Sequence, residues 1–306
     1  MTRFGIDDLP ERGKEPNSAA NLSKWISKVE IDMEIGGGRL SWIVASSILV
    51  AALQRTPHAD GQPLFLLKGG SLIELRLGLE ARSTGDVDTL FRGDFGEMLE
   101  ALDHTLAEDW GPIEFTRSEV ETVDAPRRIK PRRFTVSLSI RGKTWRSIDV
   151  EVSATEGDAA ERIGWVDTPR LGHFGLASAE QVASLVMEYQ VAQKLHACTD
   201  PHNPPESENY RPRDVVDLLL IREALFPTGI DLTGLRDACV DVFAVRAEEL
   251  AEQALPGRNW PPKVVAHEHW HYDYSRAADN CGFALTLAEA VDEVNDWIDA
   301  IDNSRP

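Results

Sequence analysis

The chain has 306 residues, of which 42% are hydrophobic and 27% are charged, a composition typical of a globular protein with room for two domains. No apolar run reaches the roughly eighteen residues of a membrane span, and the N-terminal residues lack the apolar segment of a signal peptide, so we expect a cytoplasmic protein without a membrane partner. The 32 basic and 51 acidic residues give a net charge of −19, which excludes a generally basic nucleic-acid binder and requires any RNA contact to be local.

The N-terminal part predicts two helices behind a loose lead-in. Residues 1–20 are polar and punctuated by proline, which favours the lead-in. Helical patterns follow over 21–35 and 39–54, separated by Gly36–Gly38. No strand precedes this glycine triplet and no Gly-Lys-Ser/Thr follows it, so it predicts a break between helices rather than a phosphate-binding loop.

Residues 64–92 combine a strand, a glycine turn, a short helix and a second strand. The apolar run 64–67 has the length of a buried strand, and Gly69 and Gly70 then allow a sharp backbone bend. Ser71 stands where we expect the helix 72–79 to start, so its hydroxyl is predicted to cap that helix while free N–H groups of the first turn hold a phosphate oxygen.

Two aspartates follow the basic turn 82–85. In a strand, residues two apart point to the same face, so Asp86 and Asp88 would project together while Val87 enters the core. Two such close negative charges favour a hard divalent cation such as Mg²⁺. The plainer alternative is a strand end with two solvated aspartates.

The next segments predict further elements of the same domain. A helix is expected over 97–108, a short strand over 113–116, and then an alternating hairpin that reverses at Arg141–Lys143. The inward face of this helix should carry Met98, Leu99, Leu102 and Leu106. The inward face of the hairpin should carry Phe134, Val136, Leu138, Ile140, Ile148, Val150 and Val152.

One dense basic run precedes the hairpin. Arg127–Arg133 contains five cations in seven residues. Two interpretations stay open: a solvated loop that balances the acidic surface, or a rim that binds RNA phosphates. If the rim is absent, Arg211 and Arg213 mark the alternative place for an RNA acceptor.

A domain boundary is expected near residue 170, because Gly, Pro and Asp punctuate residues 157–176 and strand signals stop beyond them. Residues 1–170 would form the first domain and 171–306 a helical one. Ser178 and Gln181 have capping-box spacing and predict the start of a long helix. Its buried stripe would contain Val182, Leu185, Val186, Tyr189 and Ala192.

Lys194 lies two positions past that stripe, so it is predicted to reach across a cleft, although a surface lysine is the plainer interpretation. A proline-rich loop over 199–212 leads into another helix, where Asp214 and Asp217 are three apart and share a face. Helical patterns continue over 232–255. A last helix is predicted to start at Thr286, where Glu289 completes a capping box.

The sequence gives little indication of a transition-metal site or of disulfide bonds. Cys198, Cys239 and Cys281 are an odd number without C-x-x-C spacing, so we expect free thiols. The histidines of 267–273 alternate and would share a strand face, but they lack helix-spaced or cysteine partners. An aromatic lid or packing segment is the better interpretation.

Four short motifs together resemble a known family. Lys68–Ser71 and Arg82–Asp88 are followed far downstream by Lys194–Ala197 and Arg211–Leu218. In this order they resemble the AbiEii-like (MenT-like) nucleotidyltransferase toxins of type IV-like bacterial toxin–antitoxin systems, which belong to the polymerase-β-like nucleotidyltransferase superfamily. The resemblance covers about residues 64–220.

The resemblance implies an α+β fold, in which a nucleotidyltransferase domain with a mixed sheet is closed over by a C-terminal helical domain. It implies an enzyme that transfers a nucleoside monophosphate from a nucleoside triphosphate (NTP) to RNA, with pyrophosphate leaving. The expected acceptor is the 3′ end of tRNA, so that translation stops. The resemblance also raises a cognate antitoxin as a partner.

The same resemblance implies residue roles. Asp86 and Asp88 would hold Mg²⁺ or Mn²⁺, with Asp149, or after it Glu151, as a third carboxylate from the neighbouring strand. The alternative for that pair is an exposed strand face that prefers charge. The residues expected to meet phosphate are Lys68, Gly69, Gly70, Ser71 and Arg82. Lys194 is the foremost catalytic cation, and Asp214 would orient it or the acceptor hydroxyl.

Two other classes of function stay open. A nucleotide-binding module without turnover would act through a protein partner. A metal-dependent phosphotransferase or kinase would also use a lysine and aspartates, but the sequence lacks the glycine-rich loop, strand lysine and H-R-D block of protein kinases.

Overall fold

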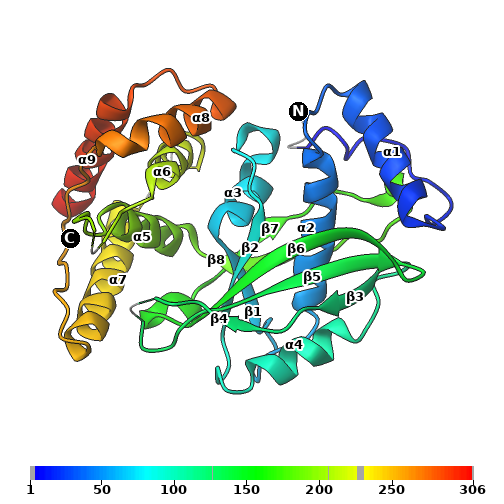
Figure 1. The fold of residues 1–306 in the computed structure, drawn as a ribbon, viewed down its shortest axis with the longest axis horizontal. Helices are drawn as coiled ribbons and strands as arrows, with labels where there is room; N and C mark the ends of the chain where they lie inside the picture. Colours follow the sequence, from blue (N-terminus) through cyan, green and yellow to red (C-terminus); the bar gives the residue numbers. More distant parts are fainter. Residues whose placement is uncertain (1–3, 126, 206, 226–230, 305–306) are drawn as a thin grey trace.

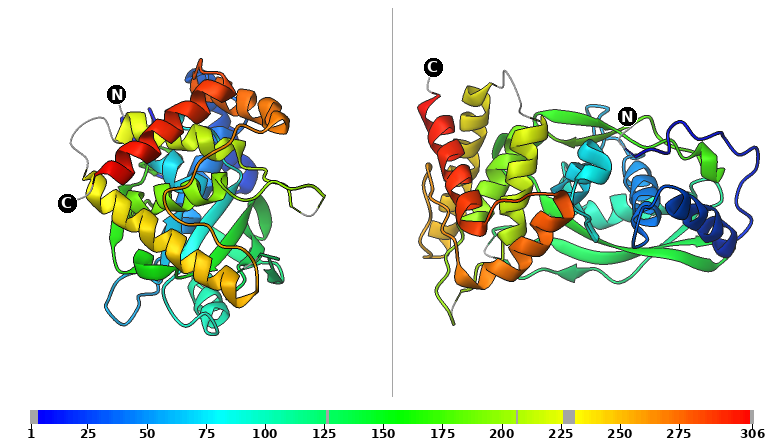
Figure 2. Two further views of the ribbon diagram at one scale, coloured as in Figure 1. Left: turned by 90° about the vertical axis from the view of Figure 1, so that its left-hand side faces the viewer. Right: turned by 90° about the horizontal axis from the view of Figure 1, so that it is seen from above.

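The computed structural model describes residues 4–125, 127–205, 207–225 and 231–304. Helices α1–α4 lie around a mixed sheet, and α5–α9 gather beside it (Figure 1). Seen from above, the molecule is elongated, with α5–α9 at one end and α1 towards the other (Figure 2). The predicted α+β class, a mixed-sheet domain followed by a helical one, is confirmed.

The sheet has the strand order β3-β5-β6-β2-β1-β8-β7, and β4 pairs with β5. The pairs β1·β8 and β2·β6 are parallel, whereas β1·β2 and β5·β6 are antiparallel. The strands are β1 (Phe65–Lys68), β2 (Asp86–Phe91), β3 (Glu114–Arg117), β4 (Glu121–Thr122), β5 (Arg132–Ile140), β6 (Lys143–Ala154), β7 (Ile163–Asp167) and β8 (Gln181–Leu185). The predicted hairpin is β5–β6, and every apolar residue named for its inward face is buried.

The first helices are α1 (Ala19–Asp32), α2 (Arg39–Leu53), α3 (Gly69–Leu77) and α4 (Met98–Leu106). Gly37 and Gly38 have φ of +71° and +70°, which glycine adopts easily, and they separate α1 from α2 as predicted. Helix α2 is buried along almost its whole length. The prediction that Leu99 lies on the buried face of α4 is wrong. Leu99 is exposed to solvent, and Thr105 is buried instead.

The lead-in is packed rather than loose. Residues 4–18 form no helix or strand, yet Phe4 and Ile6 are buried in the core. The Asp7 carboxylate accepts a hydrogen bond from the Arg170 backbone N–H at 2.8 Å, and the Arg12 guanidinium lies over the Trp25 ring. These long-range contacts, which composition does not reveal, hold the segment in place.

The C-terminal helices are α5 (Met187–Cys198), α6 (Pro212–Leu225), α7 (Leu232–Glu252), α8 (His271–Cys281) and α9 (Leu287–Asn303). The capping box of Thr286 and Glu289 is present, and it starts α9 as predicted. Short 3-10 turns lie at Gly78–Glu80, Gly157–Ala160, Gly172–Phe174 and Glu268–Trp270.

The helix predicted to begin at Ser178 is wrong. Residues 181–185 form β8, which lies between β1 and β7, and helix α5 begins only at Met187. A short apolar run fits a buried strand or a buried helix equally well, and here pairing on both edges decides for the strand. The sheet therefore extends to Leu185, beyond the predicted boundary at residue 170, which itself stays a prediction.

Two smaller expectations concern cysteines and membranes. Cys198, Cys239 and Cys281 are free thiols, as predicted. In the described part of the chain, no helix combines the length and the apolar character that crossing a bilayer requires.

Candidate active site

The turn between β1 and α3 forms one side of the site. Gly69 has φ of +69°, and a Cβ at this position would lie 2.0 Å from Asp88 Oδ2, so the turn requires glycine. Gln190 of α5 holds the same residue: its Oε1 accepts from the Gly69 N–H at 3.0 Å, and its Nε2 donates to the Gly69 carbonyl at 3.3 Å. Helix α5 is thereby fixed against the turn.

Ser71 does not cap α3, so that prediction is wrong. The helix begins two residues earlier, at Gly69, and Ser71 is buried in its first turn with its hydroxyl donating to the Asp86 carbonyl at 2.5 Å. A Cβ on Gly70 would lie 2.8 Å from Thr84 Oγ1. Ser71 therefore joins α3 to β2, and phosphate binding at this helix start stays a prediction.

Four carboxylates share one face of the sheet. Asp86 and Asp88 project from β2 while Val87 is buried, as predicted. In the parallel register of β2 and β6, Asp86 lies opposite Asp149 and Asp88 opposite Glu151. Neighbouring residues in register point to the same face, so the predicted third carboxylate is beside the pair.

The two candidates for that third carboxylate have different partners. Glu151 accepts from the Arg133 guanidinium at 2.8 Å, which compensates its charge. Asp149 accepts from the Thr135 hydroxyl at 2.7 Å, a neutral donor. This difference favours Asp149 as the carboxylate whose charge remains for a cation.

The donor set fits a hard divalent cation. Burial raises the pKa of Asp88 to about 6; Lys68 opposes this shift, and the carboxylates of Asp86 and Glu151 add to it. A cation at this position would relieve the repulsion among these groups. In the described part of the chain, no three His, Cys, Asp or Glu side chains are arranged as a ready metal site. Metal binding by Asp86, Asp88 and Asp149 therefore stays a prediction.

Lys68 ends β1 beside these carboxylates. Its Nζ donates to Ser153 Oγ at 3.0 Å. Burial lowers the pKa of Lys68, and the carboxylates of Asp88 and Glu156 oppose that shift. A buried ammonium with a neutral hydrogen-bond partner is suited to meet an added negative group such as phosphate.

A buried ion-pair network forms the other side of the site. Lys194 Nζ donates to Asp214 Oδ1 at 2.6 Å and to Asp217 Oδ2 at 2.7 Å. Arg82, from the loop before β2, donates through Nε and Nη2 to the two oxygens of Asp217 at 2.8 and 2.7 Å. The network thus joins the β2 loop to helices α5 and α6.

The sequence predicts that Lys194 reaches freely across a cleft, but the structure holds its side chain in place. It is only 7% exposed. Burial alone would lower its pKa, but Asp214 and Asp217 outweigh burial and raise it, so the ammonium stays charged. The predicted pairing of Lys194 with Asp214 is present, and within the described residues its Nζ makes two hydrogen bonds, which leaves one of its three N–H groups.

Comparison with known families decides the identity. The model for the nucleotidyl transferase AbiEii toxin of type IV toxin–antitoxin systems matches residues 51–300. The chain belongs to this family. Membership makes it a transferase of the nucleotidyltransferase class and implies a nucleotide substrate and a cognate antitoxin. The resemblance stated from the four motifs is therefore confirmed.

Among solved structures, the chain is similar to MenT4, a nucleotidyltransferase toxin of Mycobacterium tuberculosis, with 15% identity, coverage of 94% of this chain and 99% of that one, and a TM-score of 0.49. A nucleotidyltransferase-like protein of Paracoccidioides brasiliensis shares 14% identity over 63% of this chain and 86% of that one, with a TM-score of 0.32. No curated protein gives a significant match.

Three parts of this AbiEii-family site were missed from the sequence. Gln190 shares a face of α5 with Lys194 at i, i+4 spacing, but no local pattern shows that its amide binds the backbone of Gly69. The sequence predicted that Asp217 shares a helix face with Asp214, but not that it binds both Lys194 and Arg82. Arg39 of α2 donates to the carbonyls of Gly78, Leu79 and Ala81, and so fixes the loop before Arg82.

Replacing Gln190 with alanine should lower the turnover of the AbiEii-family site about tenfold, because the Gly69 N–H loses its partner and the turn loosens. The free energy of unfolding should fall by about 1–3 kcal/mol. Gln193→Ala is the matched control: it lies on the same helix and loses one hydrogen bond, to Glu156. Rates and thermal melts of both variants test this, and equal turnover in the two would remove Gln190 from the site.

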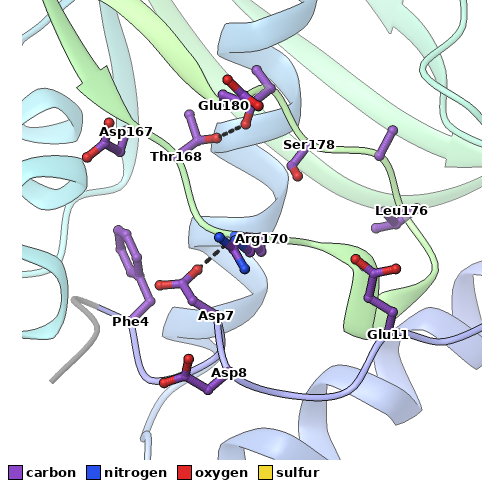
Figure 3. Close-up of a pocket in the computed structure, with 13 residues that line it drawn as sticks. Phe4, Asp7, Asp8, Glu11, Asp167, Thr168, Arg170, Leu176, Ser178 and Glu180 are labelled. Carbon is purple, nitrogen blue, oxygen red and sulfur yellow. Dashed lines mark hydrogen bonds between the residues drawn. The ribbon is translucent and has the colours of Figure 1, made fainter.

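A separate cleft of about 960 Å³ does not fit a triphosphate (Figure 3). The N-terminal segment and the β7–β8 connection form it, and among its described lining residues Arg170 is the only cation. It lies where Asp167 pairs with Gln181, at the end of β8 opposite to the one near α3. Its carboxylates are those of Asp7, Asp8, Glu11, Asp167 and Glu180.

The basic run is largely neutralised by its own protein. Arg127 pairs with Glu156 and Glu249, Arg128 with Glu252, Lys130 with Asp124, and Arg133 with Glu151. Arg132 lies over the Phe95 ring. These contacts favour the charge-balancing interpretation over the phosphate-binding rim.

Proposed function

We propose that this protein is a cytoplasmic toxin that transfers a nucleoside monophosphate from an NTP to RNA, at the 3′ end of tRNA, and thereby inhibits translation. The reaction uses Mg²⁺ or Mn²⁺. One observation carries the proposal: Asp217 binds both Lys194 of α5 and Arg82 of the loop before β2, which brings the Lys194 ammonium to the strand that carries Asp86 and Asp88. This joins a cation-binding and a phosphate-binding group from separate parts of the chain.

The chain's own residues divide the work. Lys68 and the start of α3 at Gly70, beyond the Gly69 N–H that Gln190 already binds, receive phosphate oxygens of the triphosphate. Lys194 directs its remaining N–H to the charge that develops as the bond to pyrophosphate breaks. Asp214 holds that ammonium in place.

Asp86, Asp88 and Asp149 would hold the divalent cation, which would supply positive charge to offset that of the triphosphate. Arg82 contributes through Asp217, since its two donor atoms there are already engaged. Its role is to keep Asp217, and with it Lys194, in position.

The test uses total tRNA, purified protein and each NTP labelled at the α- or the γ-phosphate. We expect α-label on full-length tRNA with release of pyrophosphate, and no label on tRNA whose 3′ hydroxyls have been destroyed by periodate. Chelation of divalent cations should stop the reaction.

Each alternative predicts a different result. Triphosphate binding without any pyrophosphate release would replace the proposal with a binding module that acts through a protein partner. Transfer of γ-label to protein, with no α-label on RNA, would replace it with a phosphotransferase.

A further inference from the structure

A cluster of aromatic rings lies in the loop between α5 and α6 and at the 3-10 turn before α8, and it has no part in the chemistry above. The ring centroids of His202 and His269 are 4.4 Å apart with an interplanar angle of 21°, and His267 lies 4.6 Å from His202 and 5.6 Å from His269. Tyr210 meets His269 edge-on at 5.5 Å. We call these four residues the ring patch.

Hydrogen bonds fix the ring patch to the end of helix α5, which carries Lys194. Asn209 is 2% exposed, and its backbone carbonyl accepts from His269 Nε2 and from Trp270 Nε1, both at 2.7 Å. Its backbone N–H donates to His202 Nδ1 at 3.3 Å. Its side-chain amide donates to the carbonyls of Ala197, Cys198 and Asp200. The rings are therefore held rigidly at the end of α5, one turn beyond Lys194.

The patch is open to solvent. Tyr210 is 64% exposed, and His269 is also exposed. The loop that carries His202 and Tyr210 projects from the helices (Figure 2). The rings of His202 and His269 are stacked, and one nitrogen of each is already hydrogen-bonded to Asn209. The patch therefore presents ring faces rather than converging metal ligands.

Two exposed arginines, Arg211 and Arg213, come just after Tyr210 in the chain. Within the described residues, neither Arg211 nor Arg213 has a side-chain ion pair, in contrast to Arg127 and Arg128 of the basic run. On so acidic a protein, two arginines that lack an ion pair with any described residue and stand beside exposed rings mark a local place for a polyanion with flat, unpaired bases.

We propose that the ring patch stacks unpaired bases near the 3′ end of the RNA acceptor, while Arg211 and Arg213 contact the adjoining phosphates. Single-stranded RNA is bound by stacking its bases on Tyr and His rings, and phosphate contacts set its path. Tyr210 and Arg211 lead directly into helix α6, whose Asp214 binds Lys194, so the patch lies on the chain segment next to the Lys194 network. This inference rests on the proposed function and adds the place where the acceptor binds.

The test measures binding of a 5′-labelled single-stranded RNA of about eight nucleotides to the full chain by fluorescence anisotropy. Tyr210→Ala should weaken binding about tenfold, whereas Tyr210→Phe, which keeps the ring, should retain it. Trp165→Ala is the matched control, since Trp165 is an exposed aromatic residue on β7, away from the patch. Binding of triphosphate, measured by calorimetry, should be unchanged in all three variants.

Salt dependence tests the arginines separately. Exchange of both Arg211 and Arg213 for glutamine should reduce the slope of log affinity against log salt by about 1–2. RNA affinity of Tyr210→Ala equal to that of the unchanged protein, or no RNA binding by the unchanged protein, would overturn the inference. So would a Tyr210→Ala variant that keeps its RNA affinity but no longer binds its antitoxin, because the patch would then be a protein interface.

The two proposals fail in different ways. If Tyr210→Ala loses RNA affinity but the unchanged protein adds no α-label to RNA, the ring patch stands as an RNA-binding surface and the transfer reaction does not. If α-label is added and Tyr210→Ala binds RNA normally, the transfer reaction stands and the ring patch does not.

Discussion

Replacing Asp86 or Asp88 with asparagine should reduce nucleotide transfer by at least about a thousandfold, because the amide keeps the shape of the side chain but removes the charge that a divalent cation requires. The measurement is the single-turnover rate of α-label transfer to RNA at saturating Mg²⁺. Asp124→Asn is a matched control, since Asp124 is an exposed carboxylate that pairs with Lys130. Transfer at the unchanged rate in Asp86→Asn would remove the carboxylate pair from the mechanism.

The Asp88 substitution should also stabilise the metal-free protein near neutral pH. Burial, opposed by Lys68, raises the pKa of Asp88 from 3.8 to about 6. The folded state then holds this proton more tightly than the unfolded state, so stability falls as pH rises from about 4 to about 6. Asparagine does not titrate. We expect a gain on the order of 1 kcal/mol in the free energy of unfolding at pH 7, after allowance for solvent screening.

Thermal melts in a chelator test this at two pH values. The variant should melt higher than the unchanged protein at pH 7, and the two should melt alike well below pH 3.8, where Asp88 is protonated in both states. Equal melting temperatures at pH 7 would show that burial and the neighbouring carboxylates do not destabilise the ionised Asp88 enough to matter.

Replacing Lys194 with methionine should lower turnover by about 10²–10³, because the developing charge on the phosphates loses its preorganised donor. Methionine keeps most of the side-chain volume. Lys194→Arg should not restore full activity, since a planar guanidinium does not fit a position that holds Nζ at 2.6 and 2.7 Å from two carboxylates. Asp214→Ala should cause a comparable loss.

Stability must be measured beside this rate. Without Lys194, Asp217 keeps Arg82 but Asp214 loses its cation, and breaking a buried ion pair costs about 3–5 kcal/mol. Turnover is therefore compared at a temperature where melts show each variant to be folded. Lys143→Ala, at an exposed turn, is the control. Full turnover in folded Lys194→Met would make the network structural alone.

Local sequence was enough for the elements whose signals are short-range. Alternation fixed the β5–β6 hairpin, the two-residue spacing put Asp86 and Asp88 on one face, and the capping box started α9 at Thr286. The four motifs also identified the family. Each of these signals lies within a few residues, where backbone geometry alone relates sequence to structure.

Tertiary structure decided what depends on partners far along the chain. Residues 181–185 became a strand because β1 and β7 offered two edges. Lys194 was predicted to be free, but it is held by Asp217. Asp217 in turn binds Arg82, which lies 135 residues before it in the chain. Arg127 and Arg128 of the basic run pair with carboxylates of α7, and Gly69 binds Gln190 of α5. Burial and charge pairing of this kind arise only when separate elements pack together, so no local pattern contains them.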